Sequence, residues 1–326
     1  MARCMKEISI GDQLDHYRVD ALVATDNHAS IFRGTDLKTG AIVAIKVPHV
    51  ELELDPVFFE RFRREQEIGQ KLNHPRVMKV LPSEHHSRDY IVMEWIDGRS
   101  LREILKEQGK LPQDRATHIA IGICDAVAYI NAHGVIHRDL RPEHILVDSD
   151  DHIKLINFGL ASQVAAKRIT FTGFAHELDT VSYAAPEEIK GQRCDARSDV
   201  YSIGVILYEM LTGKLPFKNG NPFAPMNDRL LKDPLPPRKL ESSITPQMQQ
   251  IVLRAMDRTP RYRYASAHEL AQDLAHMQDV VVDESGESRR SFRTTAAWKK
   301  NLLFYVAVAA IPVVIFVLMM LAAHRK

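Results

Sequence analysis

A polar loop between a long helix and a strand hairpin is the feature that most constrains the fold of this chain. Residues 111–133 carry apolar side chains at helical spacing, which predicts one long amphipathic helix. The loop His-Arg-Asp-Leu-Arg-Pro-Glu-His follows at positions 137–144. Residues 145–155 then form two short apolar runs around a turn rich in aspartate, which predicts a β-hairpin. Asn-Phe-Gly at 157–159 comes directly after this hairpin.

The loop and the tripeptide together resemble two motifs of protein kinases. The loop is similar to H-R-D-x-K-P-x-N, in which the Asp accepts the proton of the substrate hydroxyl and the Asn binds magnesium. This resemblance implies that Asp139 is the catalytic base if the chain is active, with Arg141 as the donor beside the phosphate. Both metal positions depart from the family, because His144 replaces the Asn and Asn157 replaces the Asp of D-F-G.

The segment before the helix is also similar to a protein kinase. Residues 17–98 are rich in β-branched runs, and they include the strand motif Val-Ala-Ile-Lys that ends at Lys46. The resemblance implies that Lys46 binds the α- and β-phosphates of ATP and pairs with Glu65 on the following helix. We therefore expect an α+β, bilobal protein-kinase fold, with a β-rich N-lobe to about residue 98 and a helical C-lobe over 99–278.

Further residue roles are implied by the same resemblance. The expected contacts with the adenine of a nucleotide are at Ile31, Ala44, Met93, Glu94, Ile96 and Leu146. The expected structural or regulatory residues are His137, Arg138, Phe158, Thr180, Glu187, Asp199 and Arg263. Within that set, His137 and Phe158 pack internally, Asp199 holds the catalytic loop, and Glu187 pairs with Arg263. Arg138 is expected to bind a phosphorylated segment, with Thr170, Thr172 and Thr180 as candidates, although Thr180 fits better as a contact of Asp139.

The chain departs from the family at two further places, apart from the metal site. Ala24, Asp26 and Ala29 stand where the family has the glycines that let backbone N–H groups approach the phosphates. Asp26 either repels the triphosphate or is simply the tip of a hairpin. Gly69 stands in the internal stack with His137 and Phe158, and it fills that stack poorly. At the metal site, a neutral Asn oxygen and a His nitrogen suit magnesium less well than softer metals.

The turn of the predicted hairpin raises a separate question. Asp148, Asp150 and Asp151 resemble a metal-binding cluster, but a solvated turn accounts much better for aspartates at these positions. We expect the turn.

The C-terminal part has the composition of a membrane anchor. Residues 301–323 contain no charged side chain and are long enough, as a helix, to cross a bilayer. Basic residues are more numerous before this span than after it, which places the preceding domain in the cytoplasm. We expect an N-terminal lead over 1–13, a kinase-like domain over 14–278, a polar linker over 279–300 and a tail over 324–326, with no signal peptide.

Composition excludes two other classes of protein. The 326 residues carry a formal net charge of +1, so no overall field attracts nucleic acid. Three widely spaced cysteines do not suggest a disulfide scaffold. The general pattern resembles bacterial transmembrane Ser/Thr kinases.

Two functions fit this sequence. The first is a membrane-tethered pseudokinase that binds ATP weakly and acts on a protein partner as a scaffold or allosteric subunit. The second is a divergent Ser/Thr protein kinase that transfers the γ-phosphate of ATP to protein hydroxyls and uses manganese or magnesium. A dimer is compatible with either function, and no residue demonstrates one.

Overall fold

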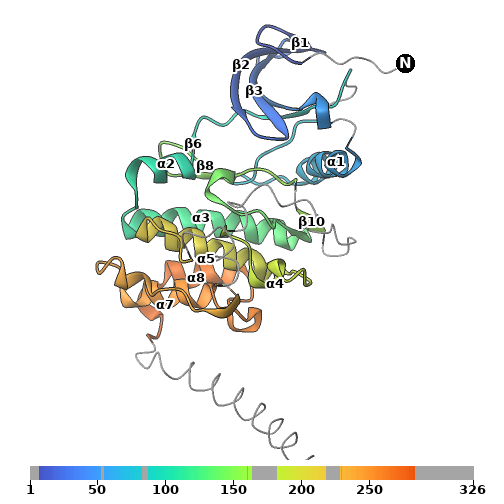
Figure 1. Cartoon of the computed structure of the whole chain (residues 1–326). Helices are drawn as coiled ribbons and strands as arrows, with labels where there is room; N and C mark the ends of the chain where they lie inside the picture. The colour runs from blue at the N-terminus through green and yellow to red at the C-terminus, as the bar shows by residue number, and fades with distance from the viewer. Residues whose placement is uncertain are drawn as a thin grey trace, which may run out of the picture. The chain divides into compact units, whose positions relative to one another are not determined.

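The computed structural model describes residues 7–52, 55–82, 87–159, 161–163, 182–217, 228 and 230–282. The chain divides into two units, Met1–Val280 and Val281–Lys326, and almost all described residues belong to the first (Figure 1). The first unit contains a strand-rich N-lobe and a helical C-lobe, as the sequence predicts.

The N-lobe is built on one antiparallel sheet with the strand order β1-β2-β3-β4-β5. Its strands are β1 (Gln13–Leu14), β2 (Tyr17–Thr25), β3 (Ala29–Asp36), β4 (Ile42–Pro48) and β5 (Ile91–Glu94). The β-branched residues of β4 favour this pleated, half-buried position. In the register of the central strands, Ala44 lies opposite Met93, and Lys46 lies opposite Ile91 and Ile31.

The helix α1 (Pro56–Lys71) follows the short 3-10 turn η1 (Val50–Leu52) and lies beside the sheet (Figure 1). Asp55 caps it, because its Oδ1 accepts a hydrogen bond from the Val57 N–H at 2.8 Å, and Pro56 occupies the first turn. Phe62 belongs to an apolar cluster that includes residues of β4 and β5. The helix thus turns one face, which includes Glu65, toward the sheet.

The C-lobe is a stack of helices around one apolar core. The helices are α2 (Leu101–Gln108), α3 (Gln113–Ala132), α4 (Pro186–Ile189), α5 (Ala196–Thr212), α7 (Pro246–Ala255) and α8 (Ala267–Ala275). Helix α5 is buried on all sides, as expected for a helix that is apolar all round. Asp195 caps its start, and Gly213, with φ of 69°, ends it in the left-handed region. The thiol of Cys124 on α3 is free and buried in the same lobe.

Short strands connect the lobes and frame the polar loop. The strands β6 (Arg99–Ser100), β8 (Ile145–Val147) and β9 (Ile153–Leu155) form one sheet, and β7 (Val135–Ile136) pairs with β10 (Ser162–Gln163). Single 3-10 turns occur at η2 (Pro142–His144), η5 (Pro237–Lys239), η6 (Pro260–Tyr262) and η7 (Met277–Asp279). The predicted hairpin is confirmed, with Ile145 opposite Leu155. The polar loop, residues 137–144, thus runs between β7 and β8.

No helix among the described residues combines the length and the apolar character that crossing a membrane requires. The predicted span over 301–323, and the linker from residue 283, lie outside the described residues.

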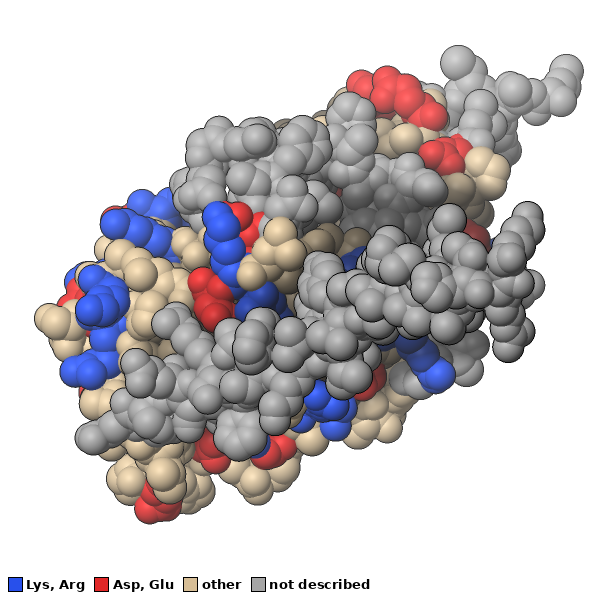
Figure 2. Space-filling model, turned by 60° about the horizontal axis from the view of Figure 1, so that its bottom comes forward, with Lys and Arg blue, Asp and Glu red and all other residues tan. Residues whose placement is uncertain are grey.

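Charges of both signs are interspersed on the described part of the face shown in Figure 2. Several basic side chains of the C-lobe are paired locally. Arg254 bonds Glu269 at 2.7 Å and Asp273 at 3.3 Å, and Arg258 bonds Asp233 at 2.9 Å.

Candidate active site

The buried carboxylate of Asp199 fixes the backbone of the polar loop. It accepts hydrogen bonds from the backbone N–H groups of His137 and Arg138, each at 3.1 Å, and from Nδ2 of Asn131 at 2.9 Å. Arg138 has φ of 67°, a conformation that a bulky side chain rarely adopts without such support. Burial raises the pKa of Asp199, and the three hydrogen bonds act against that rise. The geometry supports the predicted role of Asp199 as an anchor of the loop.

The two altered metal positions are bonded to each other. Nδ1 of His144 lies 2.7 Å from the backbone oxygen of Asp139, and an oxygen that can only accept makes Nδ1 the protonated nitrogen. In the neutral ring Nε2 then carries the lone pair, and it accepts from Nδ2 of Asn157 at 2.8 Å. Oδ1 of Asn157 in turn accepts from the N–H of Gly159 at 3.2 Å. We call this chain of hydrogen bonds from Asp139 to Gly159 the His144–Asn157 bridge.

The bridge occupies the atoms that would otherwise be the nearest metal ligands. The amide oxygen of Asn157 and the lone pair of His144 are both engaged. Asn157 has φ of 68°, and both Asn and Asp tolerate this left-handed conformation, so the backbone is compatible with either residue. A magnesium ion requires near-ideal octahedral oxygen ligation, and this donor set does not provide it. The residues present therefore fit magnesium poorly.

The ion pair expected in the N-lobe is formed. Nζ of Lys46 lies 2.6 Å from Oε2 of Glu65, and the two side chains are 14% and 3% exposed. A Cβ built on Gly159 would lie 3.5 Å from Oε2 of Glu65 and 3.4 Å from Oδ1 of Asn157. The ion pair on β4 and α1 and the His144–Asn157 bridge therefore meet at Gly159.

Four of the six residues expected around an adenine ring gather in one apolar cluster. Buried Ala44 and Met93 belong to this cluster, with partly buried Ile31 and Ile96 packed against it. Leu146, on β8, is partly buried and lies outside the described members of the cluster. The arrangement brings Ile31, Ala44, Met93 and Ile96 together on the N-lobe side.

Glu94, which is also expected to contact the adenine, is held by its neighbours. Its Oε1 accepts from Nζ of Lys154 at 2.5 Å and from the N–H of Lys79 at 2.8 Å. Its own N–H donates to the backbone oxygen of Lys79 at 3.0 Å. The side chain of Glu94 thus links β5 to β9 in the C-lobe.

The comparisons with known proteins agree with this geometry. The family model for the protein kinase domain matches residues 17–275, which is most of the chain. The chain belongs to the protein kinase domain family.

Similar proteins carry the names of bacterial Ser/Thr kinases. The probable serine/threonine-protein kinase PknB of Corynebacterium glutamicum is 34% identical over 303 residues, which cover 86% of this chain and 47% of that protein. The probable serine/threonine-protein kinase SCO3848 of Streptomyces coelicolor is 36% identical over 263 residues, covering 79% of this chain and 39% of that protein. The alignments thus span less than half the length of these relatives. The crystal structure of the Mycobacterium tuberculosis PknI kinase domain is 22% identical to this chain and superposes with a TM-score of 0.65. The match covers 83% of this chain and 100% of that chain, which shows the same fold.

The expected internal packing is present at His137 and Phe158, and Gly69 lies against Val80. The ring centroids of His137 and Phe158 lie 5.3 Å apart, as the sequence predicts for packed neighbours. Burial, followed by an electrostatic effect of the nearby His144 ring, lowers the pKa of His137 to about 3, so the His137 ring is neutral near pH 7. A Cβ on Gly69 would lie 2.2 Å from Cγ2 of Val80. The space beside Gly69 is therefore filled by Val80.

We expect Gly69→Leu to destabilise the N-lobe by about 1–3 kcal/mol, the usual cost of overpacking a core. Adding Val80→Ala should recover most of that loss, because the two side chains compete for one volume. Urea unfolding of the two single variants and the double variant measures this coupling. Additive effects of the two changes would show that Val80 does not fill the space.

A charged network beside the catalytic loop was missed by the sequence analysis. Arg141, expected near the phosphate, instead has its Nε 2.9 Å from Oε2 of Glu143. Arg102 on α2 contacts the same carboxylate at 2.8 Å, contacts Glu209 on α5 at 2.8 Å, and donates to the hydroxyl of Tyr183. Burial raises the pKa of Glu143, but the hydrogen bonds and charges of Arg141 and Arg102 outweigh it and lower that pKa to about 2. The only local signal was Glu143 itself, two residues after an arginine.

The last of the expected structural pairs joins Glu187 on α4 to Arg263, just after η6. Nη1 and Nη2 of Arg263 lie 2.7 Å and 2.8 Å from the two carboxylate oxygens of Glu187, and Ser198 donates to the same carboxylate at 2.7 Å. The predicted pairing of Glu187 with Arg263 is therefore present. Thr170, Thr172 and Thr180 lie outside the described residues.

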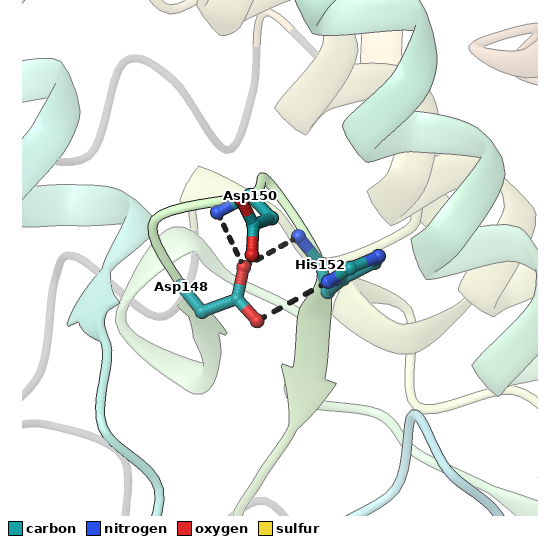
Figure 3. Close-up of side chains that lie close together, drawn as sticks. All are labelled: Asp148, Asp150 and His152. Carbon is teal, nitrogen blue, oxygen red and sulfur yellow. Dashed lines mark hydrogen bonds and ion pairs between the residues drawn. The ribbon is translucent and has the colours of Figure 1, made fainter.

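The turn between β8 and β9 behaves as a capped turn. Oδ1 of Asp148 accepts from the N–H groups of Asp150 and His152, each at 2.9 Å, and Oδ2 lies 3.3 Å from Nδ1 of His152 (Figure 3). Asp151 points elsewhere and pairs with Arg115 at 2.8 Å. Asp148, Asp150 and His152 lie close enough to hold a cation, but the bonds of Asp148 serve the turn.

Proposed function

We propose that this protein-kinase-family chain is a pseudokinase, with weak or no phosphate transfer, that acts on a protein partner as a scaffold or allosteric subunit. The single observation that carries the proposal is the His144–Asn157 bridge. In an active kinase two oxygen ligands hold the metal ions that neutralise the transferring phosphate. Here Nε2 of His144 already accepts a hydrogen bond from Asn157, so a metal would have to break that bond before it could bind His144.

The phosphate side of the site supports the same proposal. Arg141 is engaged by Glu143 at 2.9 Å, and Glu143 is also shared with Arg102 at 2.8 Å. Arginine fits a carboxylate in a fixed geometry, so releasing it toward a phosphate means breaking a partly buried pair. We infer that ATP binds weakly, through the residues predicted around the adenine ring and through Lys46.

A divergent active Ser/Thr kinase is the second candidate, and the Lys46–Glu65 pair favours it. The 2.6 Å contact is the pairing that phosphate transfer requires in this family. In that case Asp139 would be the base, and manganese would suit His144 better than magnesium does.

Membrane tethering is part of the proposal and rests on composition. The uncharged run over 301–323 and the basic residues before it support a single anchor with the kinase-like domain, over 14–278, in the cytoplasm. The polar linker over 279–300 would keep that domain near the membrane. Membership in the family implies a protein as the substrate or partner.

Phosphate transfer by the full-length chain tests this function. We expect incorporation into the chain itself and into a generic basic protein to equal that of Asp139→Asn, with magnesium or with manganese. Incorporation above this control in either metal would exclude the pseudokinase and make Asp139 a working base.

A further inference from the structure

The turn between β2 and β3 carries a carboxylate, that of Asp26, which is bonded to the backbone of the same turn. Oδ1 of Asp26 accepts hydrogen bonds from the backbone N–H groups of His28 at 2.7 Å and Ala29 at 2.8 Å. The N–H of Asp26 is bonded to the backbone oxygen of Ala29 at 3.1 Å. Converging N–H groups in a turn form a concavity that binds anions. In this chain a carboxylate of the turn itself occupies that concavity.

Two contacts hold the turn in place. The ring of His28 stacks on Phe58 of α1, with centroids 5.8 Å apart and an interplanar angle of 6°. The N–H of His49, just after β4, donates to the backbone oxygen of His28 at 3.0 Å, and Nε2 of His49 lies 3.1 Å from the hydroxyl of Ser30. The turn is thus connected to both α1 and β4, and its N–H groups stay directed at Asp26.

The position of the turn relates it to the proposed phosphate end of the site. Ala29 and Ile31 lie on β3 opposite Pro48 and Lys46 of β4, so the turn continues the strand that packs beside Lys46. An anion bound by Lys46 and extending along β3 would reach the N–H groups of His28 and Ala29. It would meet the carboxylate of Asp26 there.

We propose that Asp26 is a specificity-determining residue that makes the site discriminate against the phosphate chain of a nucleotide while leaving the nucleoside part unaffected. This inference rests on the proposed nucleotide site and goes beyond it in naming the ligand class. Asp26 acts in two ways: it occupies the N–H donors that a phosphate would use, and it repels the phosphate charge. An Asn at this position would remove only the repulsion, because its amide oxygen still accepts both hydrogen bonds.

Metal-free binding separates the two effects. Dissociation constants of adenosine and of ATP are measured for the full-length chain in excess chelator, for the wild type, Asp26→Ala and Asp26→Asn. We expect Asp26→Ala to tighten ATP about tenfold and Asp26→Asn to tighten it by no more than about threefold. Adenosine should bind all three proteins equally.

A matched control exists at the other end of β3. Oδ1 of Asp36 accepts from the N–H of Lys38 at 2.9 Å in a similar turn, roughly 23 Å away along a strand of this length. Asp36→Ala removes the same charge and should leave ATP affinity unchanged. If Asp26→Ala unfolds at a lower temperature than the wild type, Asp26→Gly is measured in its place, because glycine tolerates any turn conformation.

Three results would overturn the inference: equal gains in Asp26→Ala and Asp26→Asn, no gain in Asp26→Ala, or an equal gain in Asp36→Ala. Because the chelator removes every metal, the His144–Asn157 bridge plays no part in this measurement. The proposed absence of phosphate transfer would therefore stand even if Asp26 had no effect on ATP affinity. Conversely, the role of Asp26 would stand even if phosphate transfer were observed.

Discussion

Reverting both altered metal positions, His144→Asn together with Asn157→Asp, is expected to tighten magnesium-ATP binding by roughly a hundredfold, or about 2.7 kcal/mol. The double change removes the His144–Asn157 bridge and supplies a carboxylate and an amide oxygen, which suit magnesium. Calorimetric titration of the full-length chain with ATP, in magnesium and in chelator, measures the gain.

The single reversions are the controls for this result. His144→Asn alone leaves no anionic ligand, and Asn157→Asp alone places a carboxylate against the lone pair on Nε2 of His144. Each should gain less than about a fifth of the effect, because neighbours in one hydrogen-bond chain are not additive. A magnesium-dependent gain equal in one single variant and in the double variant would contradict the bridge as the cause.

Arg263→Ala is expected to destabilise the kinase domain by about 3–5 kcal/mol, the usual cost of leaving one partner of a buried ion pair alone. The Arg263 side chain is 0% exposed, and that of Glu187 is 7% exposed. Arg263 also donates to the backbone oxygens of Asp257 at 2.6 Å and Arg197 at 2.8 Å, which lose their partner as well. Urea unfolding measures the change, and exposed Arg261→Ala should stay within about 0.5 kcal/mol of the wild type.

The pH dependence of this loss follows from Glu187. Burial raises its pKa, but the hydrogen bonds and charge of Arg263 outweigh burial and lower the pKa below the ordinary value. A depressed carboxylate pKa gives stability that is present above the unfolded value of about 4.3 and is lost as pH falls through the folded value. The difference between wild type and Arg263→Ala should therefore be full at pH 7 and shrink below about pH 4. A difference that grows in acid would contradict the pairing.

Local patterns predicted the fold well where several levels of information agreed. The run of β4 and the hairpin after the polar loop both formed as expected, since propensity and burial favour the same structure.

The site was predicted as a set of residues but not as a set of contacts. The sequence indicated that His144 and Asn157 depart from the family pattern. Only the geometry showed that Nδ2 of Asn157 donates a hydrogen bond to Nε2 of His144. Arg141 was likewise expected as a phosphate donor, and its pairing with Glu143 was not predicted. Arg102, which shares Glu143, lies more than thirty residues earlier in the chain. Side-chain pairing between distant segments is set by tertiary packing, which local spacing does not encode.

The same limit applies at Gly69. A glycine within a helix suggests a gap, but Val80, from the segment before β5, fills the space beside it. The sequence shows that residue 69 has no side chain, but it does not show which distant residue packs against it.

The protonation of the His144 ring tests the central claim most directly. Nitrogen NMR of the full-length chain, with ring signals assigned by comparison with His144→Asn, reports which nitrogen carries the proton. The account predicts a proton on Nδ1 and a lone pair on Nε2, with ring signals that do not move when magnesium and ATP are added. A ring protonated at Nε2, or signals that shift on addition of the metal, would show that the two residues do not close the metal site.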